Sequence, residues 1–158
     1  NIECKIKYLN EKKSLGTAGS LQLLKKNKKD NFIVINCDTI IKTDFNEFIK
    51  FHKKNKNDIS IISSMNKLEI PYGVCEIDRN QKLKKIDEKP KINFLANTGC
   101  YLINRKAIKL IPKNKYFDFT DLVTLAVKKR YKVGVYPIDR NEWIDAGSLD
   151  HINRINGL

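Results

Sequence analysis

The sequence predicts an α/β fold whose mixed, mainly parallel sheet carries helices on both faces. Between residues 1 and 64, strand-like segments alternate with helical ones, an order typical of a parallel doubly wound sheet. Residues 72–78, 83–88 and 95–104 then read as three strands without a long helix between them, which adds antiparallel strands beside the parallel set. A chain of 158 residues is long enough for one domain with its own core.

The segment at 32–38, F-I-V-I-N-C-D, organises the predicted sheet. Its apolar run predicts a strand that is buried on both faces. The strand ends at Asp38, and the ligands of open α/β sheets bind just beyond the carboxyl ends of strands. Asp38 also suits a role as a cap of the following turn, so this segment alone leaves both roles open.

Local patterns predict the other elements. Residues 1–8 alternate apolar and polar side chains, as in a half-buried strand. Gly16 and Gly19 open a helix that runs to about residue 28, and unpaired N–H groups at such a start form a generic anion site, although most such loops are only tight turns. Strands are also expected at 58–64 and 132–137, with a turn at 79–81. Further helices are expected at 44–54 after Thr43 or Asp44, at 105–111, at 120–130 after Asp118 with Asp121 as its capping partner, and from Ser148.

The net charge of +13 does not by itself indicate a nucleic-acid partner. Five of the 31 basic residues are Arg, the residue best suited to bidentate phosphate and base contacts. The Lys residues are spread along the chain, and together with abundant Asn and Ile they indicate an AT-rich genome. No run approaches the ~18 apolar residues that span a membrane. We therefore expect neither a nucleic-acid partner nor a membrane.

The four cysteines, at positions 4, 37, 75 and 100, show no C-x-x-C spacing and no neighbouring pair of His residues. Zinc is therefore not expected, and the spacing defines no disulfide. A reducing cytoplasm is the simplest setting for such a chain.

Asp38 and Asp145 form the pair of carboxylates with the clearest chemical use. Each follows an apolar strand-like segment and precedes a turn, so both can reach one edge of the sheet. Two carboxylates, substrate phosphates and water make a typical Mg²⁺ site. The alternative is two unrelated capping acids, which sequence spacing does not exclude.

Two further segments offer groups for a phosphorylated polyol. Glu88-Lys89-Pro90 ends a strand with a Lys that can bind a phosphate and a Glu that can accept hydrogen bonds from hydroxyls, although a surface ion pair is the alternative. Asn97-Thr98-Gly99 begins the next strand with an amide and close access to the backbone.

Six motifs in order carry a resemblance to a known family. The set L-G-T-A-G-S-L, V-I-N-C-D, P-Y-G-V with L-K-K-I-D-E-K-P, N-T-G-C-Y-L-I, F-D-F-T-D-L and W-I-D-A-G-S resembles the sugar-1-phosphate nucleotidylyltransferases, and among them the mannose-1-phosphate guanylyltransferase-like branch. The resemblance implies a Rossmann-like mixed sheet. It also implies nucleotidyl transfer from an NTP, here GTP, to a hexose 1-phosphate, with release of pyrophosphate for nucleotide-sugar biosynthesis.

The resemblance also implies roles for single residues. Asp38 and Asp145 would hold Mg²⁺, and Lys89 would bind the sugar 1-phosphate. Glu11 would read guanine, because a carboxylate is a pure acceptor and guanine presents N1–H and N2–H₂ as donors; a solvated loop acid is the alternative. The hexose would be faced by Gly73, Glu88, Asn97 and Tyr101, and the base would be lined by Gly16, Thr17 and Ala18.

The chain departs from the family pattern in three places. The Gly-rich G-G-x-G-T-R-L phosphate loop, with the Lys that follows it, is absent, and residue 1 is not Met. We therefore expect residues 1–158 to be the C-terminal two-thirds of one catalytic domain, inactive by itself. Position 37 is Cys where the family usually has Gly, and Ala146 replaces a larger apolar residue.

Three rival functions follow from the same residues. A metal-dependent glycosyltransferase usually carries D-x-D at the metal strand, whereas this chain has Asn36-Cys37-Asp38. A non-catalytic nucleotide-sugar sensor would not need Asp38, Lys89 and Asp145 together. A basic nucleic-acid binder would show an Arg cluster or a module motif, and neither is present. Assembly into a homo-oligomer is left open.

Overall fold

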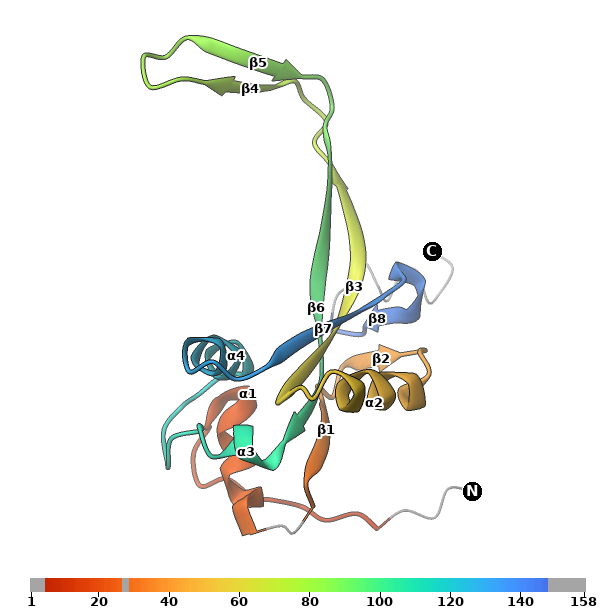
Figure 1. Ribbon diagram of the computed structural model, residues 1–158, viewed down its shortest axis with the longest axis vertical. Coiled ribbons are helices and arrows are strands. Elements are labelled where there is room, and N and C mark those ends of the chain that lie inside the picture. Colours follow the sequence, from red (N-terminus) through yellow and green to blue (C-terminus); the bar gives the residue numbers. More distant parts are fainter. Residues whose placement is uncertain (1–4, 27–28, 148–158) are drawn as a thin grey trace.

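A computed structural model describes residues 5–26 and 29–147 (Figure 1). Its main sheet has four strands in the order β1-β6-β3-β7. The strand β6 runs antiparallel to both of its neighbours, and β3 runs parallel to β7. The strands are β1 (Asn31–Ile35), β6 (Lys91–Asn104), β3 (Ile59–Glu69) and β7 (Val133–Ile138). The predicted mixed sheet is confirmed, but the antiparallel β6 lies within the parallel set, between β1 and β3, and not beside it.

The strand β1 is buried on one face only within the described residues, so the predicted burial on both faces is wrong. Phe32 and Val34 pack on the core, whereas Ile33 and Ile35 are each 44% exposed. The strand predicted at 1–8 is also absent from residues 5–8, and Tyr8 is 86% exposed. Residues 1–4 lie outside the described part. Alternation alone did not produce a strand because residues 5–8 have no partner strand in the described sheet.

Helices cover both faces of the sheet, as predicted. On one face, Ile59, Ile61, Tyr101 and Ile103 form a core with residues of four helical segments. On the other face, Ile62 and Leu102 pack against Phe48 of α2 (Phe45–Lys54), whose N-cap is Asp44. The four segments of the first face are α1 (Gly16–Gly19), η1 (Ser20–Lys26), α3 (Arg105–Ile108) and α4 (Phe119–Lys128). The predicted helix from Ser148 lies outside the described residues.

A long two-stranded ribbon rises from the sheet (Figure 1). Beyond Ser64, β3 pairs only with β6, from Met65 opposite Leu95 to Glu69 opposite Lys91. The ribbon ends in the antiparallel hairpin of β4 (Val74–Ile77) and β5 (Leu83–Asp87), which confirms the predicted antiparallel pairing and turn. These two strands form a sheet of their own, so their predicted place beside the parallel strands is wrong. We call residues 65–95 the arm. Its apolar side chains are largely exposed, as at Met65 and Leu95, which are 51% and 52% exposed.

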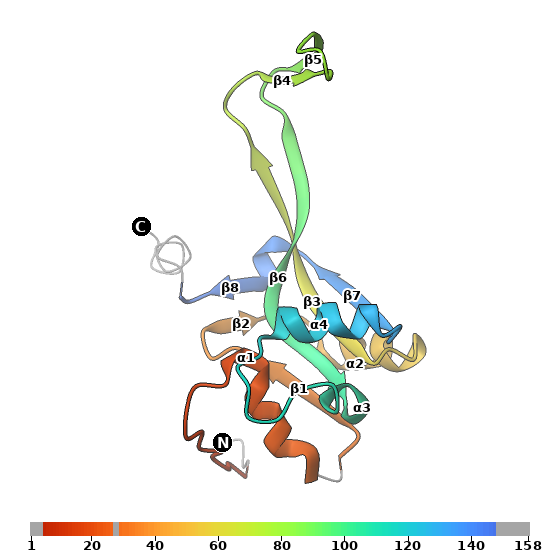
Figure 2. The same cartoon turned by 90° about the vertical axis from the view of Figure 1, so that its left-hand side faces the viewer.

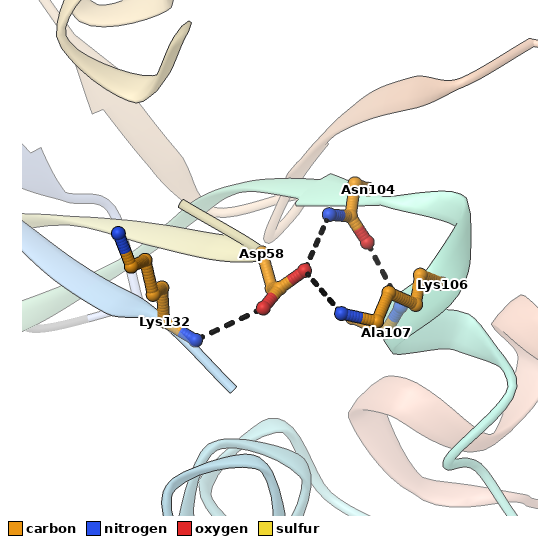
Figure 3. A network of polar contacts seen from close by, with 5 residues as sticks. All are labelled: Asp58, Asn104, Lys106, Ala107 and Lys132. Carbon is orange, nitrogen blue, oxygen red and sulfur yellow. Dashed lines mark hydrogen bonds and ion pairs between the residues drawn. The ribbon is translucent and has the colours of Figure 1, made fainter. Parts of the chain in front are cut away.

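Asp58 ties four segments together at the end of the sheet where β3 begins (Figure 3). Its Oδ1 accepts hydrogen bonds from Asn104 Nδ2 at 2.8 Å and Lys106 Nζ at 3.5 Å. Its Oδ2 accepts the Lys132 backbone N–H at 2.9 Å. Burial raises the pKa of Asp58, but these hydrogen bonds and the Lys106 charge outweigh it and hold the pKa below its usual value. The carboxylate therefore joins the start of β3, the end of β6, α3 and the start of β7.

The elements of the candidate site lie at the end of the sheet opposite to Asp58. Figure 2 shows α1, the start of α4, β2 (Thr39–Ile41) and β8 (Trp143–Asp145) on its left-hand side, away from the ends of α2 and α4. The strands β2 and β8 form a separate antiparallel pair, and η2 (Arg140–Glu142) directly precedes β8. Among the described residues, no helix is both long and apolar enough to cross a membrane.

Candidate functional site

The pairing of β2 with β8 brings the two predicted carboxylates together. Thr39, which follows Asp38, is the register partner of Asp145. The Ala146 N–H donates a 2.8 Å hydrogen bond to the Asp38 carbonyl. A Cβ built on Gly147 would lie 2.9 Å from Asp38 Oδ2 and 3.2 Å from Asp145 Oδ1. Both carboxylates therefore face one point, where they could share a cation.

The turn after β1 is held by β6. The Asn36 N–H donates to the Gly99 carbonyl at 3.1 Å, and the Asn36 side chain lies over the Gly99 Cα. A Cβ at Gly99 would lie 2.5 Å from Asn36 Nδ2, and the φ of +77° also requires glycine there. The Thr39 hydroxyl donates to the Thr98 carbonyl at 2.9 Å. These contacts fix the direction in which the chain leaves β1 and carries Asp38.

A cleft of about 200 Å³ opens beside the two acids. One wall is the Asn97–Tyr101 segment of β6, and the other is formed by the turn after β1 together with β8. The cleft is small and polar, and it combines two carboxylates with hydroxyl and amide groups. Its lining comprises Asn36, Asp38, Thr39, Asn97, Thr98, Gly99, Tyr101, Trp143 and Asp145.

The Asn97 amide organises the β6 wall. Its Oδ1 accepts the Gly99 N–H at 3.1 Å, and its Nδ2 donates to the Tyr101 hydroxyl at 2.7 Å. Burial raises the pKa of Tyr101, although the bond from Asn97 lowers it, so the phenol stays protonated at neutral pH. Because its oxygen already accepts from Asn97, the Tyr101 O–H is left to act as a donor.

The donor set fits a hard divalent cation that keeps other ligands. Magnesium is usually held by one or two carboxylates plus water and substrate phosphates, and Asp38 and Asp145 supply two carboxylates. Across residues 5–26 and 29–147 there is no group of three or more His, Cys, Asp or Glu that could enclose a metal alone. The arrangement does not suit a structural zinc site, which needs four protein ligands.

The loop at Gly16–Ala18 is held by the segment before α4. The Thr17 N–H donates to Asp118 Oδ1 at 2.9 Å, and the Ala18 N–H donates to the Phe117 carbonyl at 3.0 Å. Both donors are therefore used within the protein, which favours the tight turn over the generic anion site among the two alternatives. Gly16 has a φ of +76°, and a Cβ there would lie 2.8 Å from Asp118 Oδ1.

Glu11 closes the turn that precedes this loop. Its Oε2 accepts the Leu15 N–H at 3.1 Å. The side chain borders a separate hollow of about 550 Å³, which it shares with Asn10, Lys12, Lys13, Leu15, Leu23 and Asn114. The bond to Leu15 gives Glu11 a structural role, and its predicted reading of guanine stays a prediction.

Three predicted sugar-phosphate residues lie on the arm. A Cβ on Gly73 would lie 3.1 Å from Glu88 Oε2, so these two residues are neighbours. The Lys89 N–H donates to the Tyr72 carbonyl at 3.3 Å. The structure brings Gly73, Glu88 and Lys89 together where the hairpin of β4 and β5 joins the ribbon. This part of the arm lies away from β2 and β8, so the three residues are not brought to Asp38 and Asp145 (Figure 1). Their predicted roles stay predictions.

The sequence interpretation missed part of the cleft lining. Asn36 begins the Asn36-Cys37-Asp38 turn, Thr39 follows it, and Trp143 of β8 also lines the cleft. Thr39 begins a strand of three residues, too short for a pattern of alternation to reveal. The position of Thr39 directly after Asp38, the candidate metal ligand, is the sequence signal that could have identified it.

Comparison with known proteins gives a family match over nearly the whole chain. The nucleotidyl transferase family matches residues 1–157. A mannose-1-phosphate guanyltransferase 2 of Candida glabrata is 31% identical over 150 residues, which cover 90% of this chain and 41% of the relative. A UTP–glucose-1-phosphate uridylyltransferase of Synechocystis is 29% identical over 157 residues, which cover 92% of this chain and 40% of that relative.

A solved structure gives the same fold. The structure of HddC from Yersinia pseudotuberculosis complexed with GMP-PN aligns with a TM-score of 0.61 and 25% identity, over 91% of this chain and 62% of that one. The present chain therefore spans about two fifths of the two curated relatives and less than two thirds of the solved chain. The two relatives differ in the nucleotide that their names give.

Proposed function

Because the chain belongs to the nucleotidyl transferase family, we propose that it forms the metal-binding and sugar-facing part of a sugar-1-phosphate nucleotidylyltransferase. The observation that carries the proposal is the convergence of Asp38 and Asp145 on one point beside Gly147, at the mouth of a polar cleft. A phosphate-rich substrate pair needs a cation there, and a polyol needs the donors and acceptors of the cleft wall.

In the proposed reaction, a phosphate oxygen of the sugar 1-phosphate attacks the α-phosphorus of the NTP. The bond between the α-phosphorus and the bridging oxygen breaks, and pyrophosphate leaves with that oxygen. Such transfers depend mainly on positioning and on stabilisation of charge. Bound Mg²⁺ would supply charge neutralisation, and Asp38 and Asp145 are the residues proposed to hold it.

The cleft wall is proposed to orient the sugar. Tyr101 offers its O–H as a donor, and Asn97 keeps one N–H of its amide beyond the bond to Tyr101. In the same proposal, Lys89 binds the phosphate of the sugar 1-phosphate, and Glu88 and Gly73 face the hydroxyls of the sugar. Their part requires the arm to approach the cleft.

GTP is the proposed nucleotide, with Glu11 as the residue that reads the base. A carboxylate accepts from both N1–H and N2–H₂ of guanine, whereas uracil and thymine present an N3–H donor between two acceptors. The Gly16–Ala18 loop is proposed to line the same base.

The test is product formation by the natural protein that contains these residues. GTP, UTP, ATP and dTTP are each incubated with Mg²⁺ and with mannose 1-phosphate or glucose 1-phosphate, and NDP-sugar and pyrophosphate are both measured. The proposal expects equal amounts of the two products with at least one pair. Binding of an NDP-sugar without product from any pair would overturn it in favour of a non-catalytic sensor.

A further inference from the structure

The side chain of Asp118 connects the Gly16–Ala18 loop to the start of α4. Its Oδ1 accepts both the Thr17 N–H at 2.9 Å and the Thr17 hydroxyl at 3.1 Å, across 101 positions of sequence. The Thr17 Oγ1 in turn accepts the Phe119 N–H at 2.9 Å. Asp118 is also the N-cap residue of α4, and its own N–H donates to Asp121 Oδ2 at 3.2 Å.

From Phe119 the connection continues into the cleft. The ring of Phe119 stacks on that of Tyr101 with centroids 3.9 Å apart and planes 10° apart. Tyr101 and Phe119 are only 4% and 3% exposed, so neither ring can tilt without disturbing the core. The Tyr101 hydroxyl is fixed by Asn97 at 2.7 Å. Thr17, Asp118, Phe119, Tyr101 and Asn97 thus form one continuous chain of contacts.

We propose that Asp118 is a positioning residue that fixes the Gly16–Ala18 loop relative to the Tyr101–Asn97 wall of the cleft. The proposal rests on the proposed function, because it assigns the loop to the nucleotide and the wall to the sugar. Asp118 itself touches neither substrate. It sets the distance between two parts of the site that are far apart in the chain, one at α1 and the other in β6 (Figure 2).

The charge state of Asp118 suits this role. The Thr17 N–H bond is the largest influence and lowers its pKa, aided by the Thr17 and Tyr116 hydroxyls, so the residue is ionised at neutral pH. An ionised acceptor makes stronger hydrogen bonds than a neutral one. Gly16 adds a steric requirement, since any side chain there would meet Asp118 Oδ1 and the Phe117 carbonyl.

The Asp118→Ser substitution separates the N-cap role of Asp118 in α4 from its hydrogen bonds to Thr17. Asp118→Ser keeps a good N-cap for α4 but is too short to hold Thr17 in its present place. Asp118→Asn keeps an acceptor oxygen at the same reach. Asp44→Ser is the matched control, because Asp44 caps the ten-residue α2 through Asn46 N and has no contact with the loop.

Steady-state kinetics and amide hydrogen exchange test the proposal on the natural protein. Asp118→Ser should raise the KM for the NTP about tenfold, as expected for loss of hydrogen bonds to an ionised group, while kcat changes less. Exchange at Thr17 N–H should accelerate in the same variant. Asp118→Asn should keep both the KM for the NTP and the exchange rate at Thr17 close to the wild-type values, and Asp44→Ser should change neither.

The outcomes separate the two proposals. An unchanged KM in Asp118→Ser, with Thr17 exchange as slow as in the wild type, would overturn the positioning role. Accelerated exchange at Thr17 with an unchanged KM for the NTP would also overturn it. Asp118 would then hold the loop in the wild type without any effect on nucleotide binding. Absence of NDP-sugar from the wild-type protein would instead overturn the proposed function.

Discussion

The Ala146 N–H donates a 2.8 Å hydrogen bond to the Asp38 carbonyl, which fastens the turn after β1 to the turn after β8. Asp38 and Asp145 come from segments about a hundred residues apart in the chain, yet this bond and the β2–β8 pairing hold both acids at one point. A substitution near this bond can therefore change the geometry of the site without removing the charge of Asp38 or Asp145.

Gly147→Ala should weaken cation binding while both carboxylates remain. The added Cβ would lie 2.9 Å from Asp38 Oδ2, which is shorter than a normal contact, and 3.2 Å from Asp145 Oδ1. The acids must then move apart, and we expect the Mg²⁺ concentration for half-maximal rate to rise about tenfold, similar to changes in residues that orient metal ligands. The Tm should change little, and an unchanged Mg²⁺ requirement would count against the shared cation.

Glu11→Gln should reduce the preference for GTP over UTP. Glutamine keeps one oxygen that can accept the Leu15 N–H, so the turn before the loop is retained, but it cannot accept from two donors of guanine at once. The ratio of kcat/KM for GTP and UTP should fall about tenfold or more. Glu11→Ala removes the bond to Leu15 as well. Comparison of Glu11→Ala with Glu11→Gln therefore separates the effect of losing the turn from the effect of losing the contact with the base. An unchanged ratio in Glu11→Gln would leave Glu11 with its structural role alone.

Asp58→Asn should destabilise the fold without touching the cleft. Asparagine offers one acceptor oxygen in place of two, so either Asn104 or Lys132 loses its partner, at a cost of about 1–3 kcal/mol in the free energy of unfolding. Urea denaturation at pH 7 measures this loss. Asp30→Asn, at an exposed acid of the same end of the sheet, is the control.

The stabilisation by Asp58 should depend on pH in a defined direction. Its pKa is lower in the folded state than the usual value near 3.9 of the unfolded chain. Its contribution is therefore complete above the unfolded value and is lost as the pH falls through the folded value. The difference in unfolding free energy between wild type and Asp58→Asn should shrink with acidification below about pH 4. A constant difference from pH 7 downward would contradict the assigned cause.

Local patterns predicted the elements whose signals are local. Asp44 before α2, the pair of Asp118 and Asp121 at α4, and the turn at 79–81 all appear in the structure. Strand order could not be predicted in the same way, because the position of β6 between β1 and β3 depends on pairing between segments far apart in sequence.

The same limit applies to the site. Asp38 and Asp145 could be paired from the sequence because each follows a strand, and the structure places them together. The contact of Thr17 with Asp118 could not, because it joins residues 101 positions apart without any periodic signal. Lys89 and Glu88 were grouped with the acids by resemblance, and the structure places them on the arm.

The most direct test of the account is the Mg²⁺ dependence of NDP-sugar formation in the natural protein and in Asp38→Asn and Asp145→Asn. We expect each variant to lose about 100-fold or more of the rate at fixed Mg²⁺, since each replaces one of the two carboxylates proposed to hold the cation with a neutral amide. Asp30→Asn should behave as the wild type. Wild-type rates and an unchanged Mg²⁺ requirement in both cleft variants would contradict the claim that these two carboxylates hold the cation.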